Sequence, residues 1–179
     1  MLGDLDDRPV AARAIACALF LLVLAAFTLP FAVVTADLRR AEGNGIEFAI
    51  GEPKMSGHYV HDSYEGEVER LVDYAQPVAL AALVTLLAGV LLVWIPWKWG
   101  PAAGITFAAL GLGALVWFHQ AVNSAGTFAG TEYRGGYWIS LGLVIVAGVW
   151  SVLLFLRTPF WWRADTGPRR DYFTSPDEY

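Results

Sequence analysis

The sequence predicts an all-α integral membrane protein, a bundle of four transmembrane helices with a small β-hairpin in the first extracytoplasmic loop. Of its 179 residues, 56% are hydrophobic and only 16% are charged, whereas soluble domains carry about 45–50% apolar and about 25% charged residues. The apolar residues lie in four runs without Asp, Glu, Lys or Arg, at 14–36, 74–97, 101–121 and 136–156. Each run reaches the roughly 20 residues that a helix needs to cross a bilayer.

The first helix is expected at 14–36, after a cytoplasmic N-terminal segment at 1–13. Pro30 lies inside this run, and we interpret it as a kink in a continuous helix. The alternative is a cleaved signal peptide, because the small residues before Asp37 resemble a cleavage site. The run is longer than the apolar part of a signal peptide and acidic residues precede it, which favours a retained helix.

The loop at 37–70 is the largest polar segment between two apolar runs. Ile46, Phe48 and Ile50 alternate with other residues at the period of a half-buried strand. A Gly-Glu-Pro-Lys turn signal then precedes a second stretch at 58–61 that suits a returning strand. We therefore expect a β-hairpin that binds partners. The candidate contact residues are Ile46, Phe48, Ile50 and Tyr59.

The remaining segments complete the predicted topology. They are a second helix at 71–97, a short cytoplasmic link at 98–100, a third helix at 101–121, a short extracytoplasmic loop at 122–135, a fourth helix at 136–157 and a cytoplasmic tail at 158–179. With both termini cytoplasmic, seven basic residues lie inside and five outside, a bias in the direction of the positive-inside rule. The sequence has many Ala, Gly, Val and Arg residues and few Lys residues, a composition that indicates a prokaryote. We therefore expect the protein in the cell membrane of a prokaryote.

The tail begins with aromatic and basic residues that suit an anchor at the membrane interface. Basic side chains near the surface attract anionic lipid with about 1 kcal/mol each; a solvated tail is the alternative. The candidate lipid-facing anchors are Trp161, Trp162, Arg163, Arg169 and Arg170.

Small residues four positions apart predict close helix packing in the third helix. The pairs are Gly104 with Ala108 and Ala109 with Gly113. Small residues on several faces of this helix also favour a central position in the bundle. Packing within the bundle is the simpler interpretation, and a groove that faces a partner is the alternative.

The layout resembles that of the claudin-like tetraspan proteins, with a strand-bearing first outer loop and a tight inner link. The Trp-Gly-Leu-Trp motif and the cysteine pair of those proteins are missing, because residues 37–70 contain neither Trp nor Cys. The resemblance is therefore one of topology alone and implies no functional residue.

Three histidines are the sharpest chemical feature of the sequence. With the predicted topology, His58, His61 and His119 fall on the same outer side, and imidazole is a common ligand for zinc, copper and haem iron. On a flat strand, however, His58 and His61 would point to opposite faces. Exposed loop histidines and a hydrogen-bonded His119 are the simpler interpretation. The single cysteine, Cys17, excludes an intrachain disulfide and a multi-cysteine centre.

The absence of Asp, Glu, Lys and Arg from the four apolar runs argues against proton relays, ion-coupled transport and voltage sensing. The net charge of −5 does not suggest a nucleic-acid partner. We therefore expect a non-catalytic tetraspan protein, an accessory subunit of a membrane complex or a self-assembling component, without a cofactor. Its partners would be membrane lipids and other membrane proteins or itself. The alternatives are a redox or metal- or haem-binding subunit that uses the outer histidines, and a binder of lipid or small molecules near Pro30.

Overall fold

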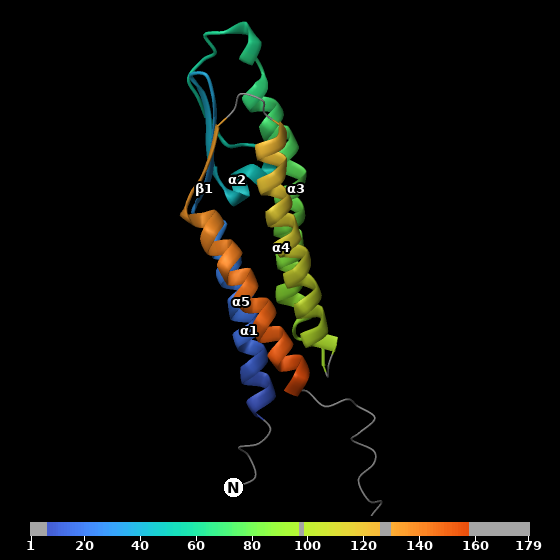
Figure 1. The fold of residues 1–179 in the computed structure, drawn as a ribbon. Helices are drawn as coiled ribbons and strands as arrows, with labels where there is room; N and C mark the ends of the chain where they lie inside the picture. The colour runs from blue at the N-terminus through green and yellow to red at the C-terminus, as the bar shows by residue number, and fades with distance from the viewer. Residues whose placement is uncertain (1–6, 97–98, 126–129, 158–179) are drawn as a thin grey trace, which may run out of the picture.

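The computed structural model describes residues 7–96, 99–125 and 130–157. Four long helices run along one another, and a small sheet stands above the ends of two of them and beside the upper parts of the other two (Figure 1). The helices are α1 (Asp7–Ala26), α3 (Glu67–Leu92), α4 (Trp99–Ala125) and α5 (Gly135–Arg157). The sheet consists of β1 (Pro30–Ala36), β2 (Arg39–Asn44), β3 (Lys54–Ser56) and β4 (Gly130–Tyr133), and it is accompanied by the short helix α2 (Gly45–Ile50) and the 3₁₀ helix η1 (Asp62–Tyr64).

The prediction of apolar, membrane-length helices is confirmed for three of the four segments. Helical stretches at Asp62–Leu92, Trp99–Asn123 and Gly135–Arg157 are long and apolar enough to cross a membrane. The apolar part of α1, Val10–Ala26, is shorter.

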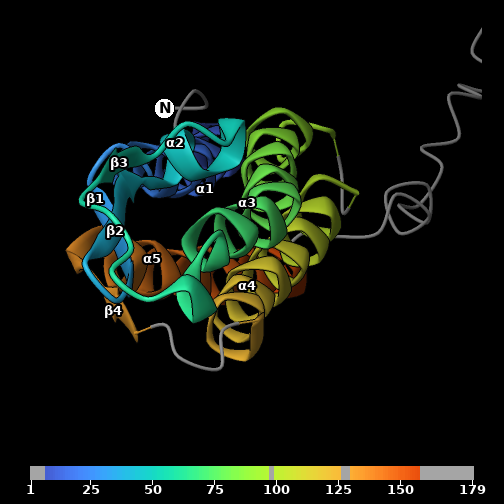
Figure 2. The same cartoon turned by 90° about the horizontal axis from the view of Figure 1, so that it is seen from above.

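The four long helices form a ring in which α3 packs on α1 and α4, and α5 packs on α4 and α1 (Figure 2). Close approach depends on glycine at several contacts. A Cβ atom at Gly89 of α3 would lie 2.7 Å from the ring of Phe20 in α1, and one at Gly104 of α4 would lie 2.6 Å from the Ser151 hydroxyl of α5. The expected central position of the third helix is wrong, because α4 packs mainly between two neighbours.

The first predicted helix is too long, since the helix ends at Ala26 and residues 30–36 form strand β1. Pro30 does not kink a continuing helix; it begins the strand, where its missing N–H costs no ladder hydrogen bond. The residues that follow are apolar and partly β-branched, which favours a strand. From Phe31 to Val34 each residue is at most 3% exposed, as expected for a strand with neighbours on both sides.

The predicted strand at 46–50 is also wrong, because this segment forms helix α2. Asn44 and Glu47 make a capping box: the Asn44 side chain accepts from the Glu47 N–H at 2.8 Å, and the Glu47 carboxylate accepts from the Asn44 N–H at 2.9 Å. Gly51 ends the helix at φ 78°. The returning strand lies at Lys54–Ser56 rather than at 58–61.

The sheet is antiparallel with the order β3-β2-β1-β4. A two-residue turn joins β1 to β2, with Ala36 opposite Arg39 and Asp37 at φ 55°. Strand β4 comes from the second predicted loop and pairs with β1 from Ala32 opposite Tyr133 to Thr35 opposite Gly130. Both loops on this side therefore build one sheet, where the sequence predicted a hairpin from the first loop alone.

Candidate functional site

We call the sheet, α2 and residues 51–66 together the cap. An aromatic cluster attaches the cap to the helices. Phe48 of α2 meets Phe118 of α4 with ring centroids 5.7 Å apart, and Phe31 of β1 meets Phe118 at 5.5 Å, both edge to face. All three side chains are at most 1% exposed. Because one hydrophobic core runs from the bundle into the cap, the cap is positioned by the helices.

Strand β4 is attached by a second aromatic group. The ring of His119 in α4 stacks on Tyr133 of β4, with centroids 4.4 Å apart. The Tyr133 hydroxyl donates to the His119 carbonyl at 3.1 Å, and burial raises the pKa of this hydroxyl. Tyr137 of α5 packs on Tyr133 at 4.7 Å. His119 is thus part of the contact between β4 and the bundle.

A polar network connects the cap to the start of α3. Arg39 of β2 forms an ion pair with Glu69 at 3.1 Å. The Tyr59 hydroxyl donates to the other Glu69 oxygen at 2.7 Å and accepts from the Val68 N–H at 2.9 Å. Burial and the hydrogen bond to Glu69 raise the pKa of Tyr59 to about 12. Burial alone would raise the pKa of Glu69, but the bonds from Tyr59 and Arg39 outweigh it and lower the pKa.

This network lines a cavity of about 400 Å³, together with Gly57, His58, Glu65 and Gly66. A phenol with a pKa of about 12 stays protonated at neutral pH, and the Glu69 carboxylate is already paired. Neither group is therefore poised as a general base. The network fixes residues 57–69 against β2, and its role in the structure is positional.

The tip of the cap is the turn between β1 and β2 with the segment that crosses it. The Asp37 carboxylate accepts from the backbone N–H groups of Val60 and His61, and these bonds lower the pKa of Asp37, the one from Val60 most. Leu38 and Val60 are left 58% and 56% exposed. We call Leu38 and Val60 the tip pair.

Gly57 is required where this segment passes the turn. It has φ 79°, and a Cβ atom there would lie 1.9 Å from the Leu38 carbonyl oxygen. The backbone of the segment therefore lies directly on the turn, and the tip pair has a fixed position.

The three histidines do not form a common centre. His58 and His61 are exposed on the segment after β3, and His119 lies in its aromatic stack. Within residues 7–96, 99–125 and 130–157, no group of three His, Cys, Asp or Glu side chains could hold a metal ion.

The predicted contact residues divide into two sets. Ile46 and Ile50 are 36% and 53% exposed on α2, whereas Phe48 is fully buried and is a core residue rather than a contact residue. Tyr59 is partly buried in the polar network. The lipid-facing anchors Trp161, Trp162, Arg163, Arg169 and Arg170 lie outside the described residues.

Of the two small-residue pairs predicted in α4, one is buried and one is exposed. Gly104 and Ala108 are buried in the bundle, while Ala109 and Gly113 lie on its outer surface. A Cβ atom placed at Gly113 would meet open space, with no described atom of another element within 4 Å.

Sequence reasoning missed Asp37, Leu38 and Val60. An Asp in a two-residue hairpin turn is a recognisable signal, but it was hidden because the flanking strand was assigned to a helix. No protein-family model and no curated protein matches this chain.

Proposed function

We propose that this chain is a non-catalytic tetraspan membrane protein that acts through protein–protein contacts made by the tip of its cap. The observation that supports this function is the tip pair. Leu38 and Val60 are more than half exposed on backbone that Asp37 and Gly57 hold in place. Contiguous exposed apolar surface marks protein–protein contact sites, and in this proposal Leu38 and Val60 contribute such a surface at the end of the cap. The protein serves as an accessory subunit of a membrane complex or as a self-assembling component.

The fourth span of this proposal is α1. Its apolar part is about 25 Å long at 1.5 Å per residue, at the short end of the range for spanning helices. It lies antiparallel to α5: the Trp150 indole donates to the Ala12 carbonyl at 3.0 Å, and a Cβ atom at Gly136 would lie 3.1 Å from the Ala26 carbonyl oxygen. The two contacts are equally spaced along both helices, which supports a crossing of α1 beside α5.

The proposed orientation places the cap outside the cytoplasm of a prokaryotic cell and both termini inside. The cap end carries Arg39, Arg40, Lys54, Arg70 and Arg134. From sequence order, the proposed topology assigns Arg8, Arg13, Lys98, Arg157 and the three arginines of the tail to the opposite side. The excess lies on the side of the termini, as the positive-inside rule expects.

The test is site-specific photo-crosslinking of the full chain in its own membrane. A photoreactive phenylalanine analogue at position 38 or 60 should give one discrete crosslinked species. The same analogue at position 52 is the matched control, because Glu52 is an exposed cap residue away from the tip. Leu38→Asp should abolish the crosslink from position 60, since a charge disrupts an apolar contact.

The mass of the crosslinked species distinguishes a second copy from a different membrane protein. Equal crosslinking from positions 38, 60 and 52, or none from any of them, contradicts the proposal. So does stoichiometric metal or a haem band in the purified protein, which would favour a redox or metal-binding subunit.

A further inference from the structure

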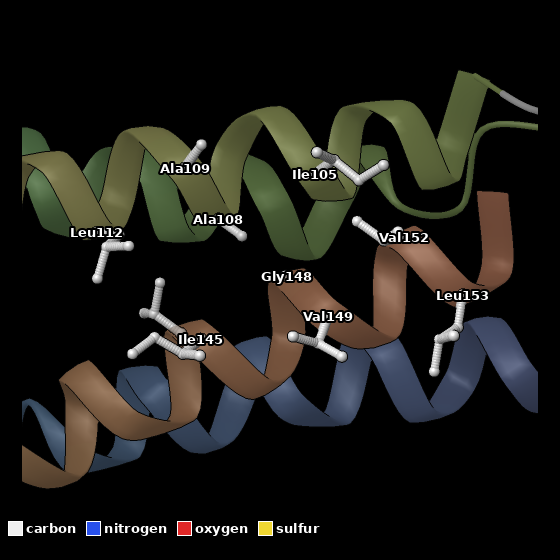
Figure 3. A pocket seen from close by; sticks show the side chains of 10 residues that line it. Ile105, Ala108, Ala109, Leu112, Ile145, Gly148, Val149, Val152 and Leu153 are labelled. Carbon is white, nitrogen blue, oxygen red and sulfur yellow. The ribbon is translucent and has the colours of Figure 1, made fainter. Parts of the chain in front are cut away.

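An apolar groove of about 370 Å³ runs between α4 and α5 on the outside of the bundle (Figure 3). Its floor is the contact of Ala108 with Gly148, where a Cβ atom at Gly148 would lie 3.3 Å from that of Ala108. The larger side chains of Leu112 and Ile145 border it on one side of this contact, and those of Ile105, Val152 and Leu153 on the other. The groove contains no titratable side chain.

The groove belongs to one leaflet of the bilayer. On α5 it extends from Val144 to Leu153, about 14 Å at 1.5 Å per residue. One leaflet contributes about 15 Å to a hydrocarbon core of about 30 Å. These residues lie in the part of α5 that is far from the cap, and the α4 residues lie in the corresponding first half of that helix.

The length and the lining of the groove suit an extended hydrocarbon chain. The groove is apolar along about 14 Å of helix, and an extended chain can follow it from end to end. An α-helix with its side chains is about 10 Å wide. A helix from a second copy would reach the floor of the groove only with side chains from one of its faces, whereas a hydrocarbon chain can contact the floor along its whole length.

Arg157 lies at the end of the groove that faces the membrane surface. Arg157 ends α5 four residues after Leu153, and residues four apart lie on the same face of a helix. Its side chain is exposed, and within the described part of the chain it has no ion-pair partner. An anionic group near Arg157 would thus meet a charge that no carboxylate of the described residues pairs with.

We propose that this groove binds one acyl chain of an anionic phospholipid, with the headgroup phosphate on the Arg157 guanidinium. Only the methylene chain contacts the apolar walls, so any phospholipid of suitable chain length fits them. The arginine confers the preference for a negatively charged headgroup. The site uses no cap residue and is independent of the proposed contact function.

The test is native mass spectrometry of the full chain in mild detergent, titrated with dioleoyl phosphatidylglycerol or dioleoyl phosphatidylcholine. These lipids have the same acyl chains and differ in headgroup charge. One phosphatidylglycerol should bind more tightly than phosphatidylcholine. Arg157→Gln should weaken phosphatidylglycerol binding about fivefold. Its effect on phosphatidylcholine should be smaller, because the choline cation offsets the phosphate charge of that lipid.

Filling the groove should remove binding of both lipids. Ala109→Phe adds a ring at the exposed α4 border of the groove, and Val149→Phe adds one at the α5 border, where Val149 is 57% exposed. Val84→Phe is the matched control for bulk, because Val84 is 56% exposed on α3. Lys54→Gln on the cap is the control for charge. Both control variants should bind phosphatidylglycerol like the wild type.

Three outcomes would overturn the proposal. Equal affinity of the wild type for the two lipids would show that no headgroup charge is recognised. Unchanged phosphatidylglycerol binding in Arg157→Gln would exclude the arginine. A dimer that binds no lipid and that Ala109→Phe dissociates would show that a second copy covers the groove.

Discussion

Replacing Phe48 with Ala tests whether α2 is a packing element or a contact surface. The Phe48 ring is fully buried and meets Phe118 edge to face, with an interplanar angle of 77°. Truncation of a buried Phe costs about 3–5 kcal/mol through lost burial and the cavity left behind. The aromatic pair accounts for about 0.5–1.5 kcal/mol of this. We expect most of the loss to appear in the attachment of the cap to the bundle.

The assay is hydrogen exchange of the amides in α2, measured by mass spectrometry in mild detergent. Each 1.4 kcal/mol changes an equilibrium constant tenfold. Phe48→Ala should therefore raise the rate at which the α2 amides exchange through opening of this helix by about 100-fold or more. Ile50→Ala is the matched control on the same helix, because Ile50 is 53% exposed and exposed truncations change stability by about 0.5 kcal/mol or less. If both variants exchange alike, Phe48 is not what attaches the cap.

Three further predictions follow from the cap and from the contact of α1 with α5. Gly57→Ala should detach the segment that crosses the β1–β2 turn, because its Cβ would overlap the Leu38 carbonyl oxygen; limited proteolysis should then cleave that segment faster than in the wild type. Trp150→Phe removes the indole hydrogen bond to Ala12 and should lower the stability of the α1–α5 contact by about 1 kcal/mol, measured as faster exchange in α1 with that in α4 unchanged. The Asp37 carboxylate has a pKa below its ordinary value of 3.8 in the folded cap, so its stabilisation is present at neutral pH and is lost as the pH falls below about 4; exchange at the two amides that bind it, corrected for intrinsic rates, should rise only in that acidic range.

The long helices could be predicted because a helix that can cross a membrane needs about 20 apolar residues, and such a run is visible in the sequence itself. The run without charges at 136–156 corresponds closely to α5 at Gly135–Arg157. Charge density does not distinguish a helix from a buried strand, however. Residues 14–36 form one uncharged run, but the structure divides it into α1 and β1. The first part packs between helices and the second pairs with two strands, and tertiary context decided between them.

The sequence near α2 contains a signal that could have corrected the predicted strand. Ile46, Phe48 and Ile50 fit the strand period, but Asn44 and Glu47 have the spacing of a capping box. A short apolar segment fits both the helix period and the strand period. The helix-capping residues Asn44 and Glu47 are therefore better evidence here than the alternation of apolar residues.

The candidate site was less predictable than the fold, because its geometry depends on distant contacts. β4 is a four-residue strand whose pairing with β1 spans about a hundred residues of sequence, and no local pattern encodes such a partner. Likewise, the ion pair between Arg39 and Glu69 joins a strand to a helix, which sequence spacing does not reveal. The exposure of Leu38 follows only once the turn between β1 and β2 is known.

The sheet also determines the axial offset between α1 and α5. Three residues separate α1 from β1, and only Arg134 separates β4 from α5, so a slide of one helix along the other must shift the β1–β4 pairing. Strand pairing that keeps the same faces inward shifts in steps of two residues, about 6.8 Å, whereas helix packing repeats with the turn, about 5.4 Å. Because these two periods differ, a slide that restores one contact disrupts the other. The helix contact and the strand pairing are therefore both satisfied at the observed offset, and a shift by one repeat of either breaks the other.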